Sequence, residues 1–345
     1  MIRLRPGTRL LPRIGGVLAA AATALVALAL NASAAEPMRI GVLKLASSGP
    51  VFIAAAEGYF AAEGLDASLV YFDAAQPVAV AAVSGDIDVG VTGLTAGFYN
   101  LAGKGELRII GAQSREEPGY HLIAYLAGNR AYDAGLTGLA DLPGHSVAVT
   151  QVGSTFHYSL GLLAEKLKFP LDRLRIVPLQ SMSAEASALE GNSVDAALLP
   201  GTVALPLVAR GAAHLLGWVG DETPWQLGAV FAARKTITTR RAAMVAFLKA
   251  YGRGVRDYYE AFLAKNADGT PKQGAKAPAL LAIIAKYTGQ KPELIKTAIP
   301  YVDPQGRLMV RDIYHQIAWY QSQGLVPKDV TAASILDYSL IVYDR

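Results

Sequence analysis

The sequence predicts an α/β protein built from two similar lobes, each with a mostly parallel sheet covered by helices on both faces. Three observations predict it. Short apolar strands alternate with helices from residue 38 onward, the same alternation starts again near residue 128, and a single strand followed by helices ends the chain. Repeated strand-helix units form parallel sheets with helices on both faces. A chain of 345 residues is long enough for two such lobes.

The first lobe begins with a strand at residues 38–45 and a helix at residues 52–65. Ser48 is placed to cap this helix, Pro50 suits its first turn, and Gly64 is a typical C-terminal stop. Apolar patterning and turn residues then predict strands at 67–72, 87–93 and 107–113 and helices at 77–85 and 95–103.

The second lobe repeats this order after a strand at residues 121–128. Its later strands are predicted at 146–152, 173–179, 193–201 and 213–219, and its helices at 154–169, 183–191 and 202–211. A last strand at residues 226–235 cannot make a domain with helices alone, so we expect it to return to the first sheet. The boundaries predicted are therefore 38–127 plus 225–345 for lobe I and 128–224 for lobe II. Two chain crossings, near Ala127 and Trp225, would form a two-crossing hinge.

Residues 1–34 have the three parts of a secretory signal peptide. Four arginines precede an apolar stretch at residues 14–30, and the small-residue site Ala32-Ser33-Ala34 follows. An uncleaved membrane anchor is the alternative, because the apolar stretch has nearly the length of a membrane span. The cleavage site favours export to a periplasm. The chain has no cysteine, which excludes disulfides, a thiol nucleophile and a lipid-modified cysteine.

The positive charge of the chain lies at its beginning. Arg3, Arg5, Arg9 and Arg13 account for the whole formal charge of +4, and the 28 other basic residues balance 28 acidic ones. A neutral mature chain lacks the basic footprint of nucleic-acid binding. We therefore expect no nucleic-acid partner.

Catalytic and metal-binding signatures are scarce. In the stretch GSTFH at residues 153–157, Ser154 and His157 could be a nucleophile and a base, but a serine at a helix start caps backbone amides. No GxSxG string is present, and the five histidines never fall at metal-ligand spacing. We expect no enzymatic activity, no cofactor and no metal.

Small and hydroxyl residues recur where a predicted strand ends and a helix begins. The four places are Ser47-Ser48, Thr92-Gly93, Gly153-Ser154-Thr155 and Pro200-Gly201-Thr202. In open α/β sheets the carboxyl ends of the strands are the edge that binds ligands, and the free amides of helix starts attract anions. Each place alone is an ordinary helix cap. Two places from each lobe together predict an anion-binding cleft.

An organic anion also needs an apolar wall. Phe156 at a helix start and Trp225 at the second crossing are aromatic candidates, and His157 is a possible hydrogen-bond donor. Lys44 and Arg115 are possible charge partners, although long cations more often lie on solvated faces. We predict a sulfonate or a carboxylate, aliphatic or aromatic, and leave nitrate and a pyrimidine open.

Four strings resemble the nitrate/taurine/alkanesulfonate type of periplasmic binding protein in ABC import systems. They are AAAEGYFAAEGLDASLVYFDA, AAVSGDIDVGVTGLTAGFYNLAGKG, LADLPGHSVAVTQVGSTFH and LQSMSAEASALEGNSVDAALLPG. The resemblance covers about residues 38–262. It implies the two-lobed periplasmic-binding-protein fold of type II, a monomer that binds a small anionic ligand at the four strand ends, and delivery to an ABC permease and ATPase in the inner membrane.

The resemblance leaves some readings open. The first loop, KLASSGP, has no aromatic residue before its helix, unlike the alkanesulfonate binders. A sibling branch of enzymes that make the thiamine pyrimidine uses a cysteine-rich motif and iron, and this chain has no cysteine. A ligand-sensing module and an exported enzyme of the same fold are the alternatives to a transport protein.

Overall fold

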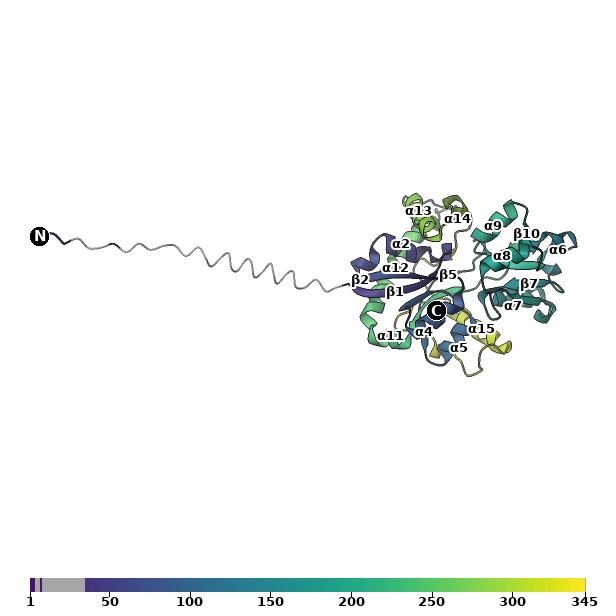
Figure 1. Ribbon diagram of the computed structural model, residues 1–345, viewed down its shortest axis with the longest axis horizontal. Coiled ribbons are helices and arrows are strands. Elements are labelled where there is room, and N and C mark those ends of the chain that lie inside the picture. The colour runs from purple at the N-terminus through teal and green to yellow at the C-terminus, as the bar shows by residue number, and fades with distance from the viewer. Residues whose placement is uncertain (4–6, 8–34, 345) are drawn as a thin grey trace.

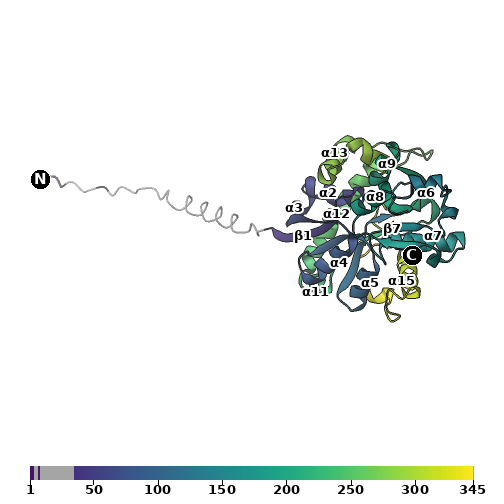
Figure 2. The same cartoon turned by 45° about the vertical axis from the view of Figure 1, so that its right-hand side comes forward.

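The computed structural model describes residues 1–3, 7 and 35–344, and residues 35–344 form two lobes (Figure 1). Each lobe contains one five-stranded sheet with helices on both faces (Figure 2), so the predicted fold class is confirmed. The apolar stretch and cleavage site of the expected signal peptide lie outside the described residues. Within the described ranges, no helix combines the length and the apolar character that crossing a membrane requires.

The sheet of lobe I has the strand order β2-β1-β3-β11-β4. Its strands are β1 (Glu36–Leu43), β2 (Leu65–Phe72), β3 (Val89–Gly93), β4 (Leu107–Ala112) and β11 (Gly228–Ala233). Strand β1 pairs in parallel with β2 and β3, whereas β11 runs antiparallel to both β3 and β4. The structure thus places the late strand in the middle of the first sheet.

Two layers of helices cover this sheet. They are α2 (Gly49–Ala56), α3 (Tyr59–Ala62), α4 (Ala75–Ser84), α5 (Ala96–Gly103), α11 (Arg234–Thr239), α12 (Arg241–Phe262), α13 (Ala277–Thr288) and α14 (Pro292–Thr297). Helix α12 packs on α2 because apolar or small residues recur along one face every three or four positions. Gly254 allows the close approach, since a Cβ there would lie 2.2 Å from the Pro50 carbonyl oxygen.

The sheet of lobe II has the order β10-β6-β9-β7-β8. Its strands are β6 (Ile123–Gly128), β7 (Ser146–Val149), β8 (Arg175–Pro178), β9 (Ala196–Pro200) and β10 (Ala213–Trp218). Its helices are α6 (Asn129–Asp133), η2 (Leu139–Asp141), α7 (Thr155–Leu167), η3 (Leu171–Arg173), α8 (Met182–Glu190), α9 (Gly201–Ala209) and α10 (Val219–Glu222).

The first crossing lies earlier in the chain than the expected position near Ala127. All of β6 pairs with β9 and β10, so lobe II already begins at Ile123. Strand β6 is buried along its whole length, and an apolar strand of this kind fits either sheet equally well when only its sequence is considered.

The two crossings are tied to each other at their centres. Glu116 of the first crossing and Trp225 of the second exchange two backbone hydrogen bonds, of 2.9 and 3.2 Å. Next to them, the Gln226 Nε2 atom donates to the Ser114 carbonyl at 3.2 Å. The crossings therefore behave as a short two-stranded ribbon rather than as two independent linkers.

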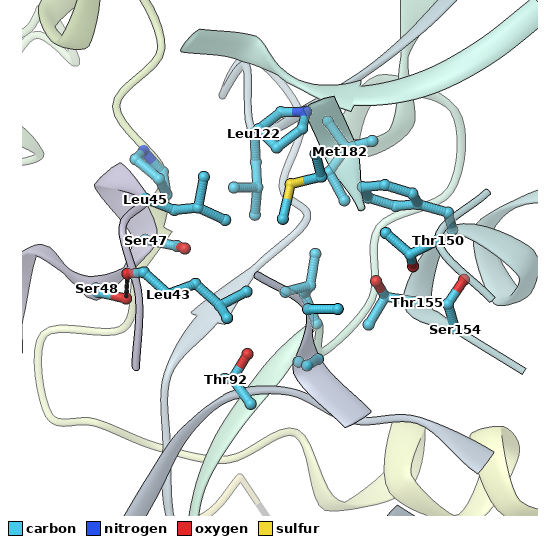
Figure 3. A pocket seen from close by; sticks show the side chains of 18 of the residues that line it. Leu43, Leu45, Ser47, Ser48, Thr92, Leu122, Thr150, Ser154, Thr155 and Met182 are labelled. Carbon is cyan, nitrogen blue, oxygen red and sulfur yellow. Dashed lines mark hydrogen bonds between the residues drawn. The ribbon is translucent and has the colours of Figure 1, made fainter. Parts of the chain in front are cut away.

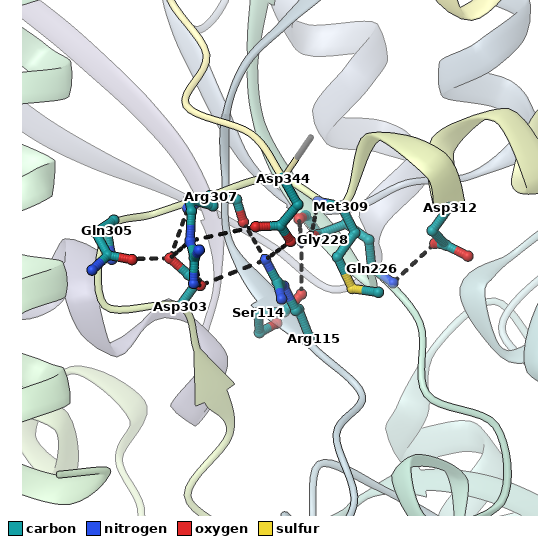
Figure 4. A network of polar contacts seen from close by, with 10 residues as sticks. All are labelled: Ser114, Arg115, Gln226, Gly228, Asp303, Gln305, Arg307, Met309, Asp312 and Asp344. Atoms are coloured by element: carbon teal, nitrogen blue, oxygen red, sulfur yellow. Dashed lines mark hydrogen bonds and ion pairs between the residues drawn. The ribbon is translucent and has the colours of Figure 1, made fainter.

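The last part of the chain fastens this ribbon to lobe I (Figure 4). Strand β5 (Ser114–Arg115) pairs with β12 (Tyr301–Val302). The Arg115 guanidinium donates to the Arg307 carbonyl at 2.7 Å and to the Asp344 carboxylate at 3.0 Å. Arg115 is thus a structural residue of the crossing and lies outside the residues that line the cleft.

Helix α15 (Val310–Ser322) lies between the lobes, and η4 (Ala332–Ser334) follows it. Helix α15 packs against α7 of lobe II, and its Gln316 side chain accepts a hydrogen bond from Tyr99 of α5 in lobe I at 2.9 Å. One hydrophobic cluster consequently runs from lobe I through α15 into lobe II.

Candidate functional site

A cleft, partly open to solvent, lies between the lobes at the carboxyl ends of their strands (Figure 3). Lobe I contributes the segments that follow β1, β3 and β4, and lobe II contributes those that follow β7 and β9. This is the edge at which the sequence predicted a site.

Ten of the thirteen predicted site residues line this cleft. They are Ser47, Ser48, Thr92, Gly93, Ser154, Thr155, Phe156, Pro200, Gly201 and Thr202. Residues of both lobes are present, so a molecule held in the cleft would touch both sheets.

Helix starts surround the cleft, but hydroxyls cap only some of them. Ser154 caps α7 by accepting a hydrogen bond from the His157 amide at 3.3 Å, as predicted. Thr95, two residues beyond the predicted pair Thr92-Gly93, caps α5 in the same way at 3.1 Å. Ser48 was expected to cap the first helix, yet its hydroxyl donates to the Leu43 carbonyl at 2.9 Å. The chain forms the tight turn of η1 (Ala46–Ser48) there, and the serine closes that turn.

The lobes come into contact at the floor of the cleft. The Ala96 amide at the start of α5 donates to the Gly153 carbonyl at 2.9 Å. Gly153 has φ +81°, and a Cβ on it would lie 2.7 Å from the Ala96 Cβ atom. A side chain is therefore excluded at this position by both conformation and space.

The cleft combines an apolar wall with uncharged polar groups. Its larger apolar side chains are Leu43, Leu45, Leu122, Ile123, Phe156, Met182 and Leu227. Its hydroxyl and amide side chains include Ser47, Thr92, Thr150, Gln151, Thr155 and Thr202. Among the described residues, no Asp, Glu, Lys, Arg or His lines the cleft. Any charge on a ligand would therefore meet only backbone amides, hydroxyls and side-chain amides.

Three predicted residues lie outside the cleft wall. Gly153 makes the contact on the floor described above, and Trp225 is 1% exposed with its ring edge-on to Tyr158 at 4.7 Å. His157 is 7% exposed, and its Nδ1 atom accepts a hydrogen bond from the Gly153 amide at 3.0 Å. Burial lowers the pKa of His157 to about 4, so the ring is neutral near pH 7. It acts as a brace for the turn before α7 and not as a donor to a ligand.

Lys44 also points elsewhere. Its ammonium group lies over the Tyr71 ring, 4.9 Å from the ring centre. The ammonium group thus makes its cation-π contact outside the residues that line the cleft.

Sequence reasoning missed several residues that line the cleft. Gln113 directly follows β4, and Thr150 and Gln151 directly follow β7, so the strand-end rule could have found all three. The Gln113 Nε2 atom donates to the Ser47 carbonyl at 3.2 Å, and its buried Oε1 atom has no partner in the part of the chain that the structure describes. Ala298 and Pro300 form a further wall, for which the local sequence holds no signal.

Across residues 35–344 and the few described before them, no three His, Asp or Glu side chains gather as a metal site would require.

A family model described as NMT1/THI5 like matches residues 46–262. The chain belongs to this family. The part matched by the NMT1/THI5-like family contains all four predicted strand ends but stops before Ala298, Pro300 and α15.

Solved structures share the fold of this NMT1/THI5-like chain. The alkanesulfonate-binding protein SsuA from Xanthomonas axonopodis pv. citri bound to MOPS is 20% identical, with a TM-score of 0.69 over 87% of this chain and 98% of that one. The periplasmic aliphatic sulphonate binding protein SsuA from Escherichia coli is 19% identical, with a TM-score of 0.68 over 88% and 98%. The periplasmic nitrate-binding protein NrtA from Synechocystis PCC 6803 is 13% identical, with a TM-score of 0.71 over 88% and 86%. No curated protein sequence matches the chain.

Proposed function

We propose that this protein is the periplasmic substrate-binding protein of an ABC importer. In this proposal it captures a small organic anion, a sulfonate or a carboxylate, between its lobes and delivers it to a membrane permease. The observation that carries the proposal is the inter-lobe cleft, in which hydroxyls at strand ends of both lobes face a largely apolar wall. The binding functions of the structural relatives support it.

The chemistry of the cleft favours a ligand with one compact anionic head and an apolar body. Leu43, Leu45 and Phe156 suit the body, while Thr92 and Thr155 suit the head. Because no charged side chain among the described residues lines the cleft, a second negative charge would stay uncompensated. The polar head would be held by hydroxyls and helix-start amides alone.

Binding would act by shifting a population of conformations. A ligand that contacts both walls of the cleft stabilises the closed arrangement of the two lobes, and a permease can recognise that closed arrangement. Ser154 and His157 do not act as a nucleophile and its base, since Ser154 caps a helix and the His157 Nδ1 atom accepts from the Gly153 amide; this supports a binding role.

A thermal-shift screen of the purified protein tests the proposal. Alkanesulfonates, aromatic carboxylates, aliphatic carboxylates, nitrate and pyrimidines form the panel. A ligand at about 100 times its Kd adds about 2.7 kcal/mol to the free energy of unfolding, which raises Tm by roughly 4 °C at an unfolding entropy of about 2.1 cal/mol/K per residue. Stabilisation by pyrimidines alone, or by no compound, would contradict the organic-anion proposal.

Variants then locate the site. Thr92→Val and Thr155→Val keep the side-chain shape and remove one donor each, so we expect Kd for the best ligand to rise about tenfold in each. Thr239→Val, on the exposed end of α11, is the matched control and should leave Kd unchanged. An equal Kd in all three variants would place the ligand elsewhere.

A further inference from the structure

A second hollow lies at the opposite end of the lobe I sheet from the cleft. It is partly open to solvent and is lined by Arg108, Arg234, Ile237, Thr238, Arg241 and Asp337. Strand β4 connects the two places, because Arg108 lies near its first residue and Gln113 of the cleft follows its last. The separation is roughly 17 Å at the usual rise of a strand.

The topology of the sheet brings the three arginines together. Strands β4 and β11 are antiparallel, with Leu107 opposite Ala233, so Arg108 and Arg234 lie on neighbouring strand ends. Helix α11 starts at Arg234 and α12 at Arg241. The sequence separation between Arg108 and the other two gave no local signal of this cluster.

The hollow has a surplus of positive charge. Its single carboxylate, Asp337, pairs with Arg241 at 3.1 Å and also accepts from the Ser339 hydroxyl. Burial raises the pKa of the Asp337 carboxyl, but these hydrogen bonds outweigh that effect and hold the pKa below its ordinary value. The carboxylate is therefore ionised, and it is already paired with Arg241 and Ser339. The hollow thus contains three guanidinium groups and one carboxylate, which is already paired with one of them.

Arg108 and Arg234 carry the uncompensated charge. Among the described residues, neither forms an ion pair, and the only acceptor that Arg108 reaches is the Leu107 carbonyl at 2.9 Å. Burial and the repulsion of Arg234 lower the pKa of the Arg108 guanidinium. The excess of arginines in this hollow does not reflect a basic composition of the chain, because basic and acidic residues balance outside the first thirteen residues.

We propose that this arginine hollow binds a phosphate group, either free or on a phospholipid headgroup. Two guanidinium groups with no carboxylate partner among the described residues match the several oxygens of a phosphate, and Arg is the side chain that binds phosphate by paired hydrogen bonds. A phosphate also carries more charge than a carboxylate, which suits a local surplus of two positive charges. The site is separate from the cleft and does not depend on the cleft ligand.

Direct binding measurements test this site. Inorganic phosphate and pyrophosphate are titrated by calorimetry at a constant ionic strength of about 0.15 M, because exposed charges are screened by salt. Vesicles of phosphatidylglycerol and of phosphatidylcholine are mixed with the protein and sedimented. Binding of the free anions alone identifies a soluble phosphate compound, whereas binding to phosphatidylglycerol vesicles identifies a headgroup.

The variants Arg108→Gln and Arg234→Gln should each weaken binding at least tenfold. Lys235→Gln, an exposed cation on α11 that does not line the hollow, is the control and should bind like the wild type. Neither arginine variant should lower Tm, since each removes repulsion and no ion pair, and both should retain the wild-type response to the cleft ligand. The proposal is overturned if no phosphate probe binds the wild type, or if both arginine variants bind as tightly as Lys235→Gln.

Discussion

The lobes touch on two sides of the cleft, and the two seams are chemically different. On one side α15 meets α5 and α7 through rings of Tyr99, Tyr158, Trp319 and Tyr320, which we call the aromatic seam. On the other side α14 lies next to α9 (Figure 1). There the Gln290 Nε2 atom donates to the Thr202 hydroxyl at 3.0 Å, and we call this pair the polar seam.

The difference shows which side can open. At the aromatic seam, a Cβ on Gly161 would lie 2.1 Å from the Trp319 ring, so α7 and α15 are in direct contact. Separating them would expose several buried rings to water. At the polar seam the contacts are smaller: one hydrogen bond joins Gln290 to Thr202, and a Cβ on Gly201 would lie 2.8 Å from the Ala298 Cβ atom. Separation there exposes only small side chains and exchanges a hydrogen bond of about 1 kcal/mol for bonds to water. We infer that the cleft opens at the polar seam and pivots at the aromatic one.

The largest effect is expected from Trp319→Ala. Removing a buried indole from a packed interface should lower the free energy of unfolding by about 3–5 kcal/mol, as measured by urea denaturation. Tyr314→Ala, on the same helix but with its side chain 50% exposed, is the control and should stay within about 0.5 kcal/mol of the wild type. Similar losses in the two variants would show that the aromatic seam does not hold the lobes together.

Acid should weaken the aromatic seam, because the His157 ring lies edge-on to Trp319 with its centre 5.3 Å away. Its pKa of about 4 in the folded protein is below the unfolded value of about 6.5. As pH falls between these values, the unfolded chain takes up a proton that the folded protein does not, so folding loses about 3 kcal/mol by pH 4. His157→Gln should flatten this part of the curve of stability against pH. An unchanged slope in the variant would assign the loss to carboxylates.

Gln290→Ala should affect ligand exchange more than stability. Loss of one hydrogen bond of about 1 kcal/mol should raise the ligand dissociation rate about fivefold, as followed by stopped-flow fluorescence. Lys296→Ala, an exposed residue of α14, is the matched control. If Gln290→Ala lowered stability as much as Trp319→Ala while the dissociation rate stayed unchanged, the polar seam would be the pivot and the aromatic seam the side that opens.

Cysteines placed at the polar seam give a second measurement. Because the chain contains no cysteine, a short bis-maleimide reacts only at positions that are introduced. Linking Gln290→Cys to Thr202→Cys should slow both entry and exit of the ligand, whereas either single variant treated in the same way should exchange ligand freely. Unimpeded exchange in the linked protein would place the opening elsewhere.

The smallest effect is expected from Tyr320→Phe. This change keeps the ring in the aromatic seam and removes only the hydrogen bond from its hydroxyl to the Ser154 carbonyl, which is 3.3 Å long. We expect a loss of about 0.5–1 kcal/mol of stability, measured by the same urea titration as Trp319→Ala. A loss as large as that of Trp319→Ala would mean that the hydroxyl, and not the packed rings, joins α15 to α7.

The strand-end part of the cleft could be predicted from sequence because its elements obey local rules. Ser47, Thr92, Ser154 and Thr202 each lie at or next to the boundary between an apolar strand and a helix. Strand order then brings such boundaries to one edge of each sheet. Neither inference requires knowledge of contacts between distant segments.

The parts that could not be predicted depend on such contacts. His157 faces Trp319, a residue 162 positions later in the chain, and nothing in the stretch GSTFH shows which way its helix is turned. Trp225 belongs to the same packed cluster rather than to the cleft. Ala298 and Pro300 reach the cleft only because α13 and α14 fold over its mouth.

The position of β11 has a consequence for how the chain folds. This strand joins the middle of the lobe I sheet, between β3 and β4, although the whole of lobe II separates it from β4 in sequence. During synthesis, lobe II can complete its sheet while lobe I still lacks a central strand, because its own strands lie within residues 123–218. Pairing across so long a separation is slow. We therefore expect lobe II to fold first and lobe I to finish only after residue 233 has been added.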